Sequence, residues 1–178
     1  RTVVLNVETL KNVALAIEDR RPVITKDITV TGRVKEVGKV FLDVPIGMPV
    51  KYYIDKCGGY IEPHGEILLG GPFTGKPGNE YSPTTKMIGG ILVSMPFPSD
   101  KRKFGLIGCE CGAQIDRLKG IVKGMGGEIV ATTNCKRMID IGGRFRCEEP
   151  GVCPGQAEKV IGLKKKGADV ILVGTCET

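Results

Sequence analysis

The sequence of 178 residues predicts two domains in succession: an α+β domain of the β-grasp type over residues 1–97, and a small parallel α/β domain over residues 98–178. The first prediction rests on the order of segments, in which two strands precede a short helix and two further strands. The second rests on three apolar strands separated by helical segments, because this alternation favours a parallel sheet with right-handed crossovers. The proline-containing segment 96–100 interrupts both patterns and marks the predicted boundary.

The first domain is predicted to open with an extended segment, residues 2–6, followed by a helix that ends near Asp19. Apolar residues recur on this helix with the spacing of one helical face, at Leu10, Val13, Ala14 and Ile17. The following segments are assigned from alternation, β-branched residues and glycine caps. In order they are strands 23–32 and 37–44, helix 50–57, strand 66–69, a Gly- and Pro-rich loop 70–78, and strand 87–95.

In the second domain, the three predicted strands 104–108, 128–132 and 170–174 each run into a cysteine, namely Cys109, Cys135 and Cys176. Helices are predicted at 114–123 and 156–166. The carboxyl ends of parallel strands share one edge of a sheet, which is where open α/β sheets build their sites. With Cys111, Cys147 and Cys153 in the adjoining loops, six of the seven cysteines are expected to converge. We therefore interpret them as a thiol or metal site rather than as buried apolar residues.

Two chemistries are open for these cysteines. Four converging thiolates suit zinc or an iron–sulfur cluster, and the predicted metal ligands are Cys109, Cys135, Cys153 and Cys176. Redox chemistry would instead use Cys109, Cys111, Cys147 and Cys153, with a disulfide joining Cys147 to Cys153 or Cys109 to Cys111. Basic residues next to Cys135 and Cys147 are expected to favour the thiolate form; these are Lys136, Arg137, Arg144 and Arg146.

Three other features have structural interpretations. Gly70, Gly71 and Gly75 could hold a phosphate or cofactor through main-chain N–H groups, although a tight turn explains them better because the P-loop lysine is missing. His64 is expected in a solvated turn, and Cys57 in a structural position at a helix end.

The net charge of +6 is dispersed and no aromatic platform accompanies it, which disfavours nucleic-acid binding. No apolar run reaches the roughly 18 residues of a membrane span, and no signal peptide is evident. No disulfide-directing feature is evident either, which points to a reducing cytoplasm, where the protein could be associated with a membrane through its partners.

Motifs in the first half follow one another as in a known family. They are NVETLKNV at 6–13, TVTG at 29–32, VPIGMPV at 44–50, CGG at 57–59 and GGPFTG at 70–75. This order resembles the C subunit of the Rnf electron-transport complex and the NADH-binding 51-kDa subunit of respiratory complex I. The resemblance implies a soluble-ligand-binding β-grasp (SLBB) domain. It also implies an upstream flavin- and NADH-binding domain, where FMN and NADH would bind, so the sequence is expected to be a fragment of a longer protein.

The second half departs from that family, whose Rnf member carries Cys-x-x-Cys-x-x-Cys runs that are missing here. The segment from Cys153 to Cys176 instead resembles the small CGGC domain of anaerobes, which is thought to bind metal. That family has Cys-Gly-Gly-Cys-Pro where this chain has Cys147 and Cys153 separated by five residues. The two halves together resemble the electron-transfer proteins associated with D-proline reductase in amino-acid-fermenting clostridia.

The predicted function is that of an electron-transfer module in a flavin- and NADH-linked oxidoreductase. In this hypothesis the cysteine site passes reducing equivalents to a partner reductase, and the chain is not a complete enzyme. The alternative is a non-catalytic module that binds a ligand or protein and carries a structural metal.

Overall fold

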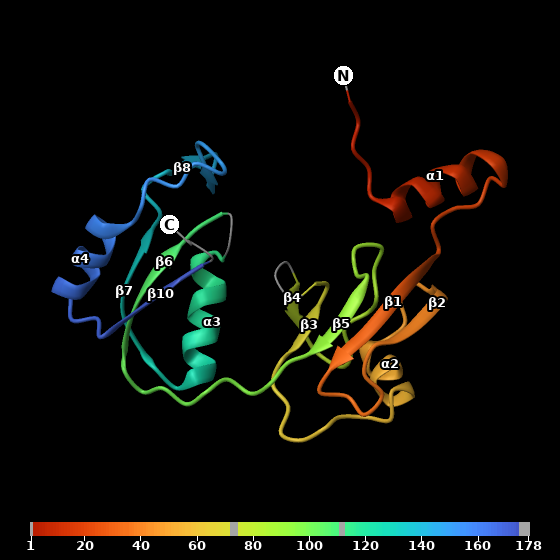
Figure 1. Ribbon diagram of the computed structural model, residues 1–178, viewed down its shortest axis with the longest axis horizontal. Coiled ribbons are helices and arrows are strands. Elements are labelled where there is room, and N and C mark those ends of the chain that lie inside the picture. Colours follow the sequence, from red (N-terminus) through yellow and green to blue (C-terminus); the bar gives the residue numbers. More distant parts are fainter. Residues whose placement is uncertain (1, 72–74, 111–112, 175–178) are drawn as a thin grey trace. The chain divides into compact units, whose positions relative to one another are not determined.

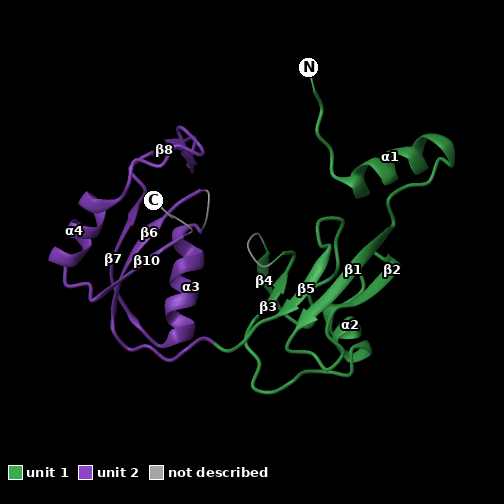
Figure 2. Ribbon diagram, viewed as in Figure 1, with its two compact units in different colours: residues 1–96 green, residues 97–178 purple. Residues whose placement is uncertain are grey.

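The computed structural model describes residues 2–71, 75–110 and 113–174, and the chain divides into two compact units, residues 1–96 and 97–178 (Figure 2). The described part has four helices and a mixture of parallel and antiparallel strand pairs, so the mixed α/β class predicted from the sequence is confirmed. In the described residues, no helix has the length and apolar character needed to cross a membrane.

Unit 1 is built on a five-stranded sheet of order β2-β1-β5-β3-β4 (Figure 1). β1 pairs with β2 as an antiparallel hairpin and with β5 in parallel, whereas β3 is antiparallel to both β4 and β5. The elements are α1 (Val7–Glu18), β1 (Thr25–Gly32), β2 (Lys39–Pro45), α2 (Val50–Lys56), β3 (Ile67–Leu69), β4 (Lys76–Gly78) and β5 (Gly90–Val93).

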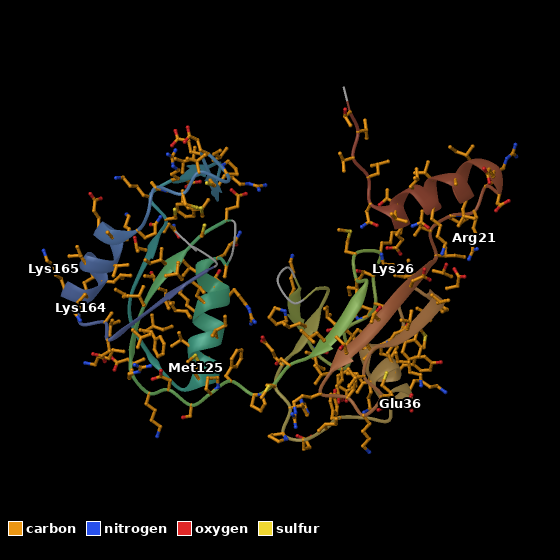
Figure 3. The ribbon with its side chains drawn as sticks, viewed as in Figure 1. Arg21, Lys26, Glu36, Met125, Lys164 and Lys165 are labelled. Carbon is orange, nitrogen blue, oxygen red and sulfur yellow. The ribbon has the colours of Figure 1, made fainter. Side chains whose placement is uncertain are left out.

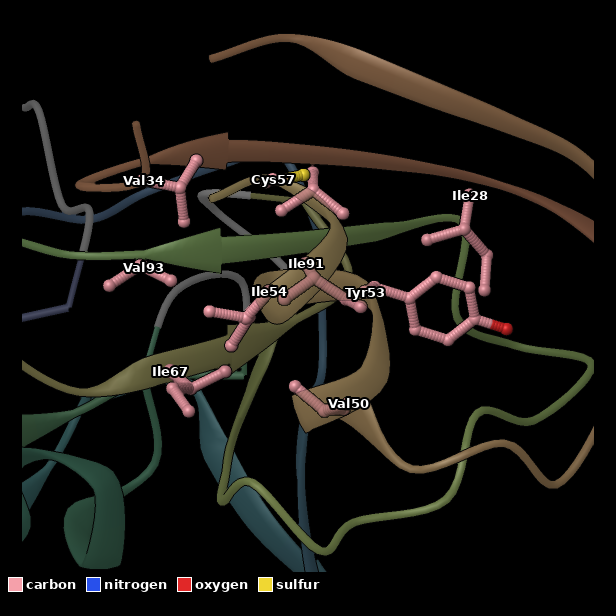
Figure 4. Packing of buried hydrophobic residues seen from close by; sticks show 10 residues of the cluster. Ile28, Val34, Val50, Tyr53, Ile54, Cys57, Ile67, Ile91 and Val93 are labelled. Atoms are coloured by element: carbon pink, nitrogen blue, oxygen red, sulfur yellow. The ribbon is translucent and has the colours of Figure 1, made fainter. Parts of the chain in front are cut away.

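The core of unit 1 lies between α2 and one face of this sheet (Figure 4). Tyr53 and Ile54 of α2 are fully buried against alternate residues of β1 and β5, including Ile28 and Ile91. The alternation of a strand places these side chains on the same face, as the sequence pattern predicts. Cys57 also belongs to this core, and its burial raises the pKa of its thiol.

Helix α1 presents its polar side to the sheet. Ion pairs join Glu8 to Lys26 and Lys11 to Asp27, the latter at 3.3 Å, and both partners lie on β1. The predicted apolar residues face away from β1: Leu10 is 58% and Ile17 74% exposed, and no residue of α1 is buried. An amphipathic helix on a core normally turns its apolar side inward, whereas this helix turns its polar side to the sheet and its apolar side to solvent. We refer to the exposed residues as the α1 apolar face, made of Val7, Leu10, Val13, Ala14 and Ile17.

Unit 2 contains a parallel sheet of order β10-β6-β7 and a separate β8–β9 hairpin. The two helices pack on opposite faces of the parallel sheet: Leu106 of β6 contacts the α3 side, and the next residue, Ile107, the α4 side. The elements are β6 (Lys103–Gly108), α3 (Ile115–Met125), β7 (Glu128–Asn134), β8 (Met138–Ile141), β9 (Arg144–Cys147), α4 (Ala157–Lys165) and β10 (Val170–Val173) (Figure 1).

Helix α4 ends in a run of lysines. Lys164 and Lys165 occupy the last turn of α4 (Figure 3), where cations interact favourably with the helix dipole. Lys166 follows as the C-cap residue.

Three short strands differ from the sequence-based prediction. β4 occupies the end of the predicted loop 70–78 and pairs with β3, although its centre is Pro77. β8 and β9 form a hairpin in a segment predicted as loop. Gly142 and Gly143 connect them with φ values of 63° and 83°, a geometry that suits glycine because it lacks a Cβ.

Candidate functional site

The candidate site lies at the carboxyl edge of the parallel sheet in unit 2. Cys109 directly follows β6 and Cys135 directly follows β7, and their residues are 4% and 6% exposed. β6 and β7 are neighbours whose register ends with Gly108 opposite Asn134. The N–H of Cys135 donates to the carbonyl oxygen of Gly108 at 2.8 Å, which extends the ladder by one residue. Two of the six predicted cysteines therefore lie next to each other at this edge.

A buried amide holds the sulfur of Cys135. Gln156, the N-cap residue of α4, is 8% exposed, and its Nε2 donates to Cys135 Sγ at 3.0 Å. Its Oε1 accepts from the N–H of Lys136 at 3.4 Å. Both ends of this amide are thus satisfied within the site, as a buried polar group requires. The sequence analysis did not identify Gln156, because nothing local distinguishes it from any other residue at the start of a helix.

The β8–β9 hairpin brings Cys147 to the same region. The N–H of Met138 donates to the carbonyl oxygen of Cys135 at 3.0 Å, and Met138 is the register partner of Cys147. Glu110, which follows Cys109, accepts hydrogen bonds from the side chain of Arg146 and from the N–H of Cys147. These two interactions lower the pKa of the Glu110 carboxyl group.

The basic residues near the cysteines have acidic partners. Arg146 pairs with Glu110, and Arg137 pairs with Glu149. Lys136 lies 3.7 Å from Glu158. The expectation that these cations act on the thiols is therefore weakened for Lys136, Arg137 and Arg146, since a carboxylate lies next to each of the three.

The other predicted site cysteines do not extend this group. Cys153 is exposed, in the loop between β9 and α4, and Cys111 and Cys176 lie outside the described residues. Cys57, Cys135 and Cys153 are free thiols. In the described parts of the chain, no three His, Cys, Asp or Glu side chains are grouped as metal ligands. Three of the four predicted metal ligands, Cys109, Cys135 and Cys153, are described, and these three are not grouped as a metal site. The set of four that includes Cys176 stays a prediction.

A pocket of about 590 Å³ lies on the α3 side of the same edge. An added Cβ on Gly108 would meet Ile115 at 2.8 Å, which shows that this position faces α3. The cavity is half polar and is lined by Gln114, Ile115, Asp116, Asn134, Met138, Gly143, Phe145 and Arg146. It therefore lies on the opposite face of the sheet from Gln156 and Cys135.

The Gly-rich loop of unit 1 uses its amides within the fold. Gly70 donates to the carbonyl oxygen of Gly90, and Gly75 to that of Gly71, each at 2.8 Å. Two of the three predicted cofactor-binding glycines, Gly70 and Gly75, thus have their N–H groups engaged, which favours the turn interpretation; residues 72–74 lie outside the described part. Gly70 and Gly71 line a pocket of about 700 Å³ that also includes Lys76 and Met87.

His64 is partly covered by a neighbouring aromatic ring. Its ring stacks on Tyr60 with centroids 4.1 Å apart, and its Nδ1 lies 2.9 Å from the carbonyl oxygen of Gly65. The side chain is still 28% exposed and lies between α2 and β3, so the expected loop position holds, while the ring of Tyr60 covers one face of the imidazole.

Comparison with known proteins identifies relatives of part of the chain. The C subunit of an ion-translocating oxidoreductase complex from Rhodobacter capsulatus is 39% identical over 92 residues, which is 51% of this chain and 17% of that protein. The chain contains an RnfC-like region. The cobalamin reductase PduS of Salmonella typhimurium is 37% identical over 92 residues, 51% of this chain and 20% of PduS. PduS of Citrobacter freundii is 31% identical over 105 residues.

The chain spans a fifth or less of the length of these curated relatives. No family model matches it. The resemblance to an Rnf-type C subunit is thereby supported for part of the chain, whereas the likeness of the second half to the CGGC domain stays a prediction.

Proposed function

We propose that this chain is an electron-transfer module of an oxidoreductase. The observation that carries the proposal is the region shared with two proteins whose names describe different redox roles, a component of an ion-translocating oxidoreductase complex and a cobalamin reductase. A region common to such proteins is more simply explained by a shared part in handling electrons than by a shared substrate.

The two units would divide this work. We assign unit 1 to the SLBB β-grasp type. The parallel pairing of its first strand with its last and the packing of α2 on one face of the sheet support this assignment. It would dock to a flavin- and NADH-binding part of the same protein. Unit 2, with its CGGC-like ending, would pass electrons to a partner reductase in the cytoplasm. D-proline reductase is the partner type suggested by the sequence resemblance.

The cysteines of unit 2 supply a chemical route for the electrons. Thiol–disulfide exchange moves two electrons at a time and needs two thiols that can approach each other. Cys109 and Cys135, on adjacent strand ends, and Cys147, joined through the hairpin, are the described thiols gathered at the sheet edge. A metal held by Cys109, Cys135, Cys153 and Cys176 is the second route, and zinc or an iron–sulfur cluster would be its occupant.

The test is a metal analysis and a thiol count on the protein purified without oxygen. For thiol chemistry we expect no stoichiometric metal, with two thiols lost on mild oxidation and regained with dithiothreitol. Stoichiometric iron would support the cluster route. Stoichiometric zinc without any redox change would contradict the proposal and favour a non-catalytic binding module with a structural metal. Seven thiols that resist oxidation, with no metal present, would also contradict it.

A further inference from the structure

The hydrogen bonds at the end of β6 and β7 define which cysteines are partners. In a parallel ladder, a residue's N–H donates to the carbonyl of the residue that precedes its partner on the neighbouring strand. Because Cys135 donates to Gly108, its partner is Cys109. This agrees with the register, in which Ile107 lies opposite Thr133 and Gly108 opposite Asn134. Cys109 and Cys135 therefore lie side by side, each one residue beyond the end of its strand.

The alternation of side chains places both sulfur atoms on the same face. Along β6, Leu106 packs on the α3 side, Ile107 on the α4 side, and Gly108 again faces α3. Successive side chains of a strand point to opposite faces, and alternation continued one residue past the end of β6 would place the Cys109 side chain on the α4 side. Cys135 is on that side too, because its sulfur accepts from Gln156 at the start of α4.

The spacing of adjacent strands fits a disulfide between these two residues. Neighbouring strands lie about 4.8 Å apart, and disulfides join residues whose Cα atoms are about 4.4–6.8 Å apart. Both cysteines also sit where their strands end, so the chain that follows is outside the ladder and can adjust as the bond forms.

We propose that Cys109 and Cys135 form the reversible dithiol–disulfide couple of this protein. This inference rests on the proposed electron-transfer function and identifies the pair that performs it. It differs from both pairs suggested by the sequence, Cys109 with Cys111 and Cys147 with Cys153.

The oxidant in this step is a disulfide on a partner protein. One thiolate of the pair attacks a sulfur of that disulfide, which forms a mixed disulfide and releases one partner thiolate. The second thiolate of the pair then attacks its neighbour's sulfur, and the Cys109–Cys135 bond forms as the mixed disulfide breaks. Two protein thiols are oxidised, one partner disulfide becomes two thiols, and the two protons pass to the released sulfurs. The reverse sequence loads the pair with electrons.

Burial should make this pair of thiols exchange more slowly than an exposed pair. With residues only 4% and 6% exposed, the sulfurs should exchange slowly with small thiols and disulfides in solution. Equilibration with dithiothreitol therefore needs long incubation, but burial does not prevent it. Cys153, which is exposed, lacks this protection.

Gln156 acts as a positioning residue for the reduced form. Its N–H donates to the Cys135 sulfur, and a disulfide sulfur accepts such a bond more weakly than a thiol or thiolate. Gln156→Leu removes the donor and should shift the equilibrium with dithiothreitol about fivefold toward the disulfide, on the order of 20 mV. A purely structural role would lower the thermal midpoint and leave this potential unchanged.

Peptide mapping distinguishes the candidate pairs. The full chain is oxidised with oxidised dithiothreitol, its remaining thiols are blocked with N-ethylmaleimide, and it is digested with trypsin and analysed by mass spectrometry. A Cys109–Cys135 bond joins peptide 104–117 to peptide 124–136. A Cys109–Cys111 bond stays inside 104–117, and a Cys147–Cys153 bond stays inside 147–159. We expect the joined peptides, restored to separate ones by dithiothreitol.

Peptide 104–117 contains two cysteines, so single variants are needed to show which of them forms the link. Cys111→Ser should retain it, whereas Cys109→Ser and Cys135→Ser should abolish it, and Cys57→Ser in unit 1 should change nothing. A reversible bond inside either single peptide would overturn the proposed pair while leaving electron transfer by thiols intact. A protein with no reversible thiol loss and no redox-active metal would instead refute the proposed function itself.

Discussion

Replacing Ile107 with alanine should expose the buried thiols of unit 2 without affecting unit 1. Ile107 is fully buried between the sheet and α4, two residues before Cys109. Truncating a buried isoleucine to alanine costs about 3 kcal/mol, because apolar contacts are lost and a cavity remains. A loss of about 3 kcal/mol raises the fraction of molecules in which unit 2 is open about 100-fold, since 1.4 kcal/mol corresponds to a factor of ten. If Cys135 reacts only in those open molecules, its reaction rate should rise by the same factor.

The assay is the rate of alkylation of Cys135 in the native protein, followed through peptide 124–136, which contains one cysteine. Cys57, in peptide 57–86, reports on unit 1 within the same molecule and should keep its rate. Ile161→Ala, at a position that is 56% exposed on α4, is the matched control and should leave both rates unchanged.

An unchanged Cys135 rate in a clearly destabilised Ile107→Ala protein would refute this reasoning. It would show that the edge opens locally, through the segments that cover the cysteines, and that the stability of the sheet does not limit access to them.

Two further predictions concern single contacts. Gly32→Ala should destabilise unit 1 by about 2 kcal/mol, because φ is 92° there and a Cβ would lie 2.0 Å from the carbonyl oxygen of Val93. The control is Gly47→Ala, where φ is 97° and the space is open, and thermal unfolding should show a loss of only about 1 kcal/mol of stability. Equal losses of stability in the two variants would contradict the steric argument. Because its folded pKa is lowered from 4.5, Glu110 should stabilise the attachment of the β8–β9 hairpin fully above that pH and lose this effect as pH falls through the folded value. Glu110→Gln should abolish that pH dependence in the hydrogen exchange of the Cys147 amide, whereas Asp116→Asn should preserve it.

The sequence was sufficient for the main elements because their patterns are local. Residues 10–17 repeat with helical spacing, and the strands before Cys109 and Cys135 are continuous apolar runs that the structure confirms as β6 and β7. The β8–β9 hairpin was missed although its signal was present, since Gly142-Gly143 between two alternating segments is typical of a two-residue hairpin turn.

The pairing of residues within the site could not be predicted from the sequence, because it depends on the register of neighbouring strands. The sequence placed Cys109 and Cys135 at strand ends, but only the ladder hydrogen bond to Gly108 shows that they are direct partners. The bond from Gln156 to Cys135 spans 21 positions and depends on how α4 returns to the sheet. Burial is likewise a property of the packed unit, so the difference between buried Cys135 and exposed Cys153 could not be read from their neighbours in sequence.

The α1 apolar face has a consequence for the behaviour of this chain in solution. Its five side chains present a hydrocarbon strip to water, while Glu8 and Lys11 on the opposite side of the helix pair with residues of β1. Salting-out agents such as ammonium sulfate strengthen contacts between such strips, so the isolated chain should be retained on a phenyl column and form colloidal clusters at high salt. Leu10→Lys would shorten that retention, and the effect would be the same for oxidised and reduced protein.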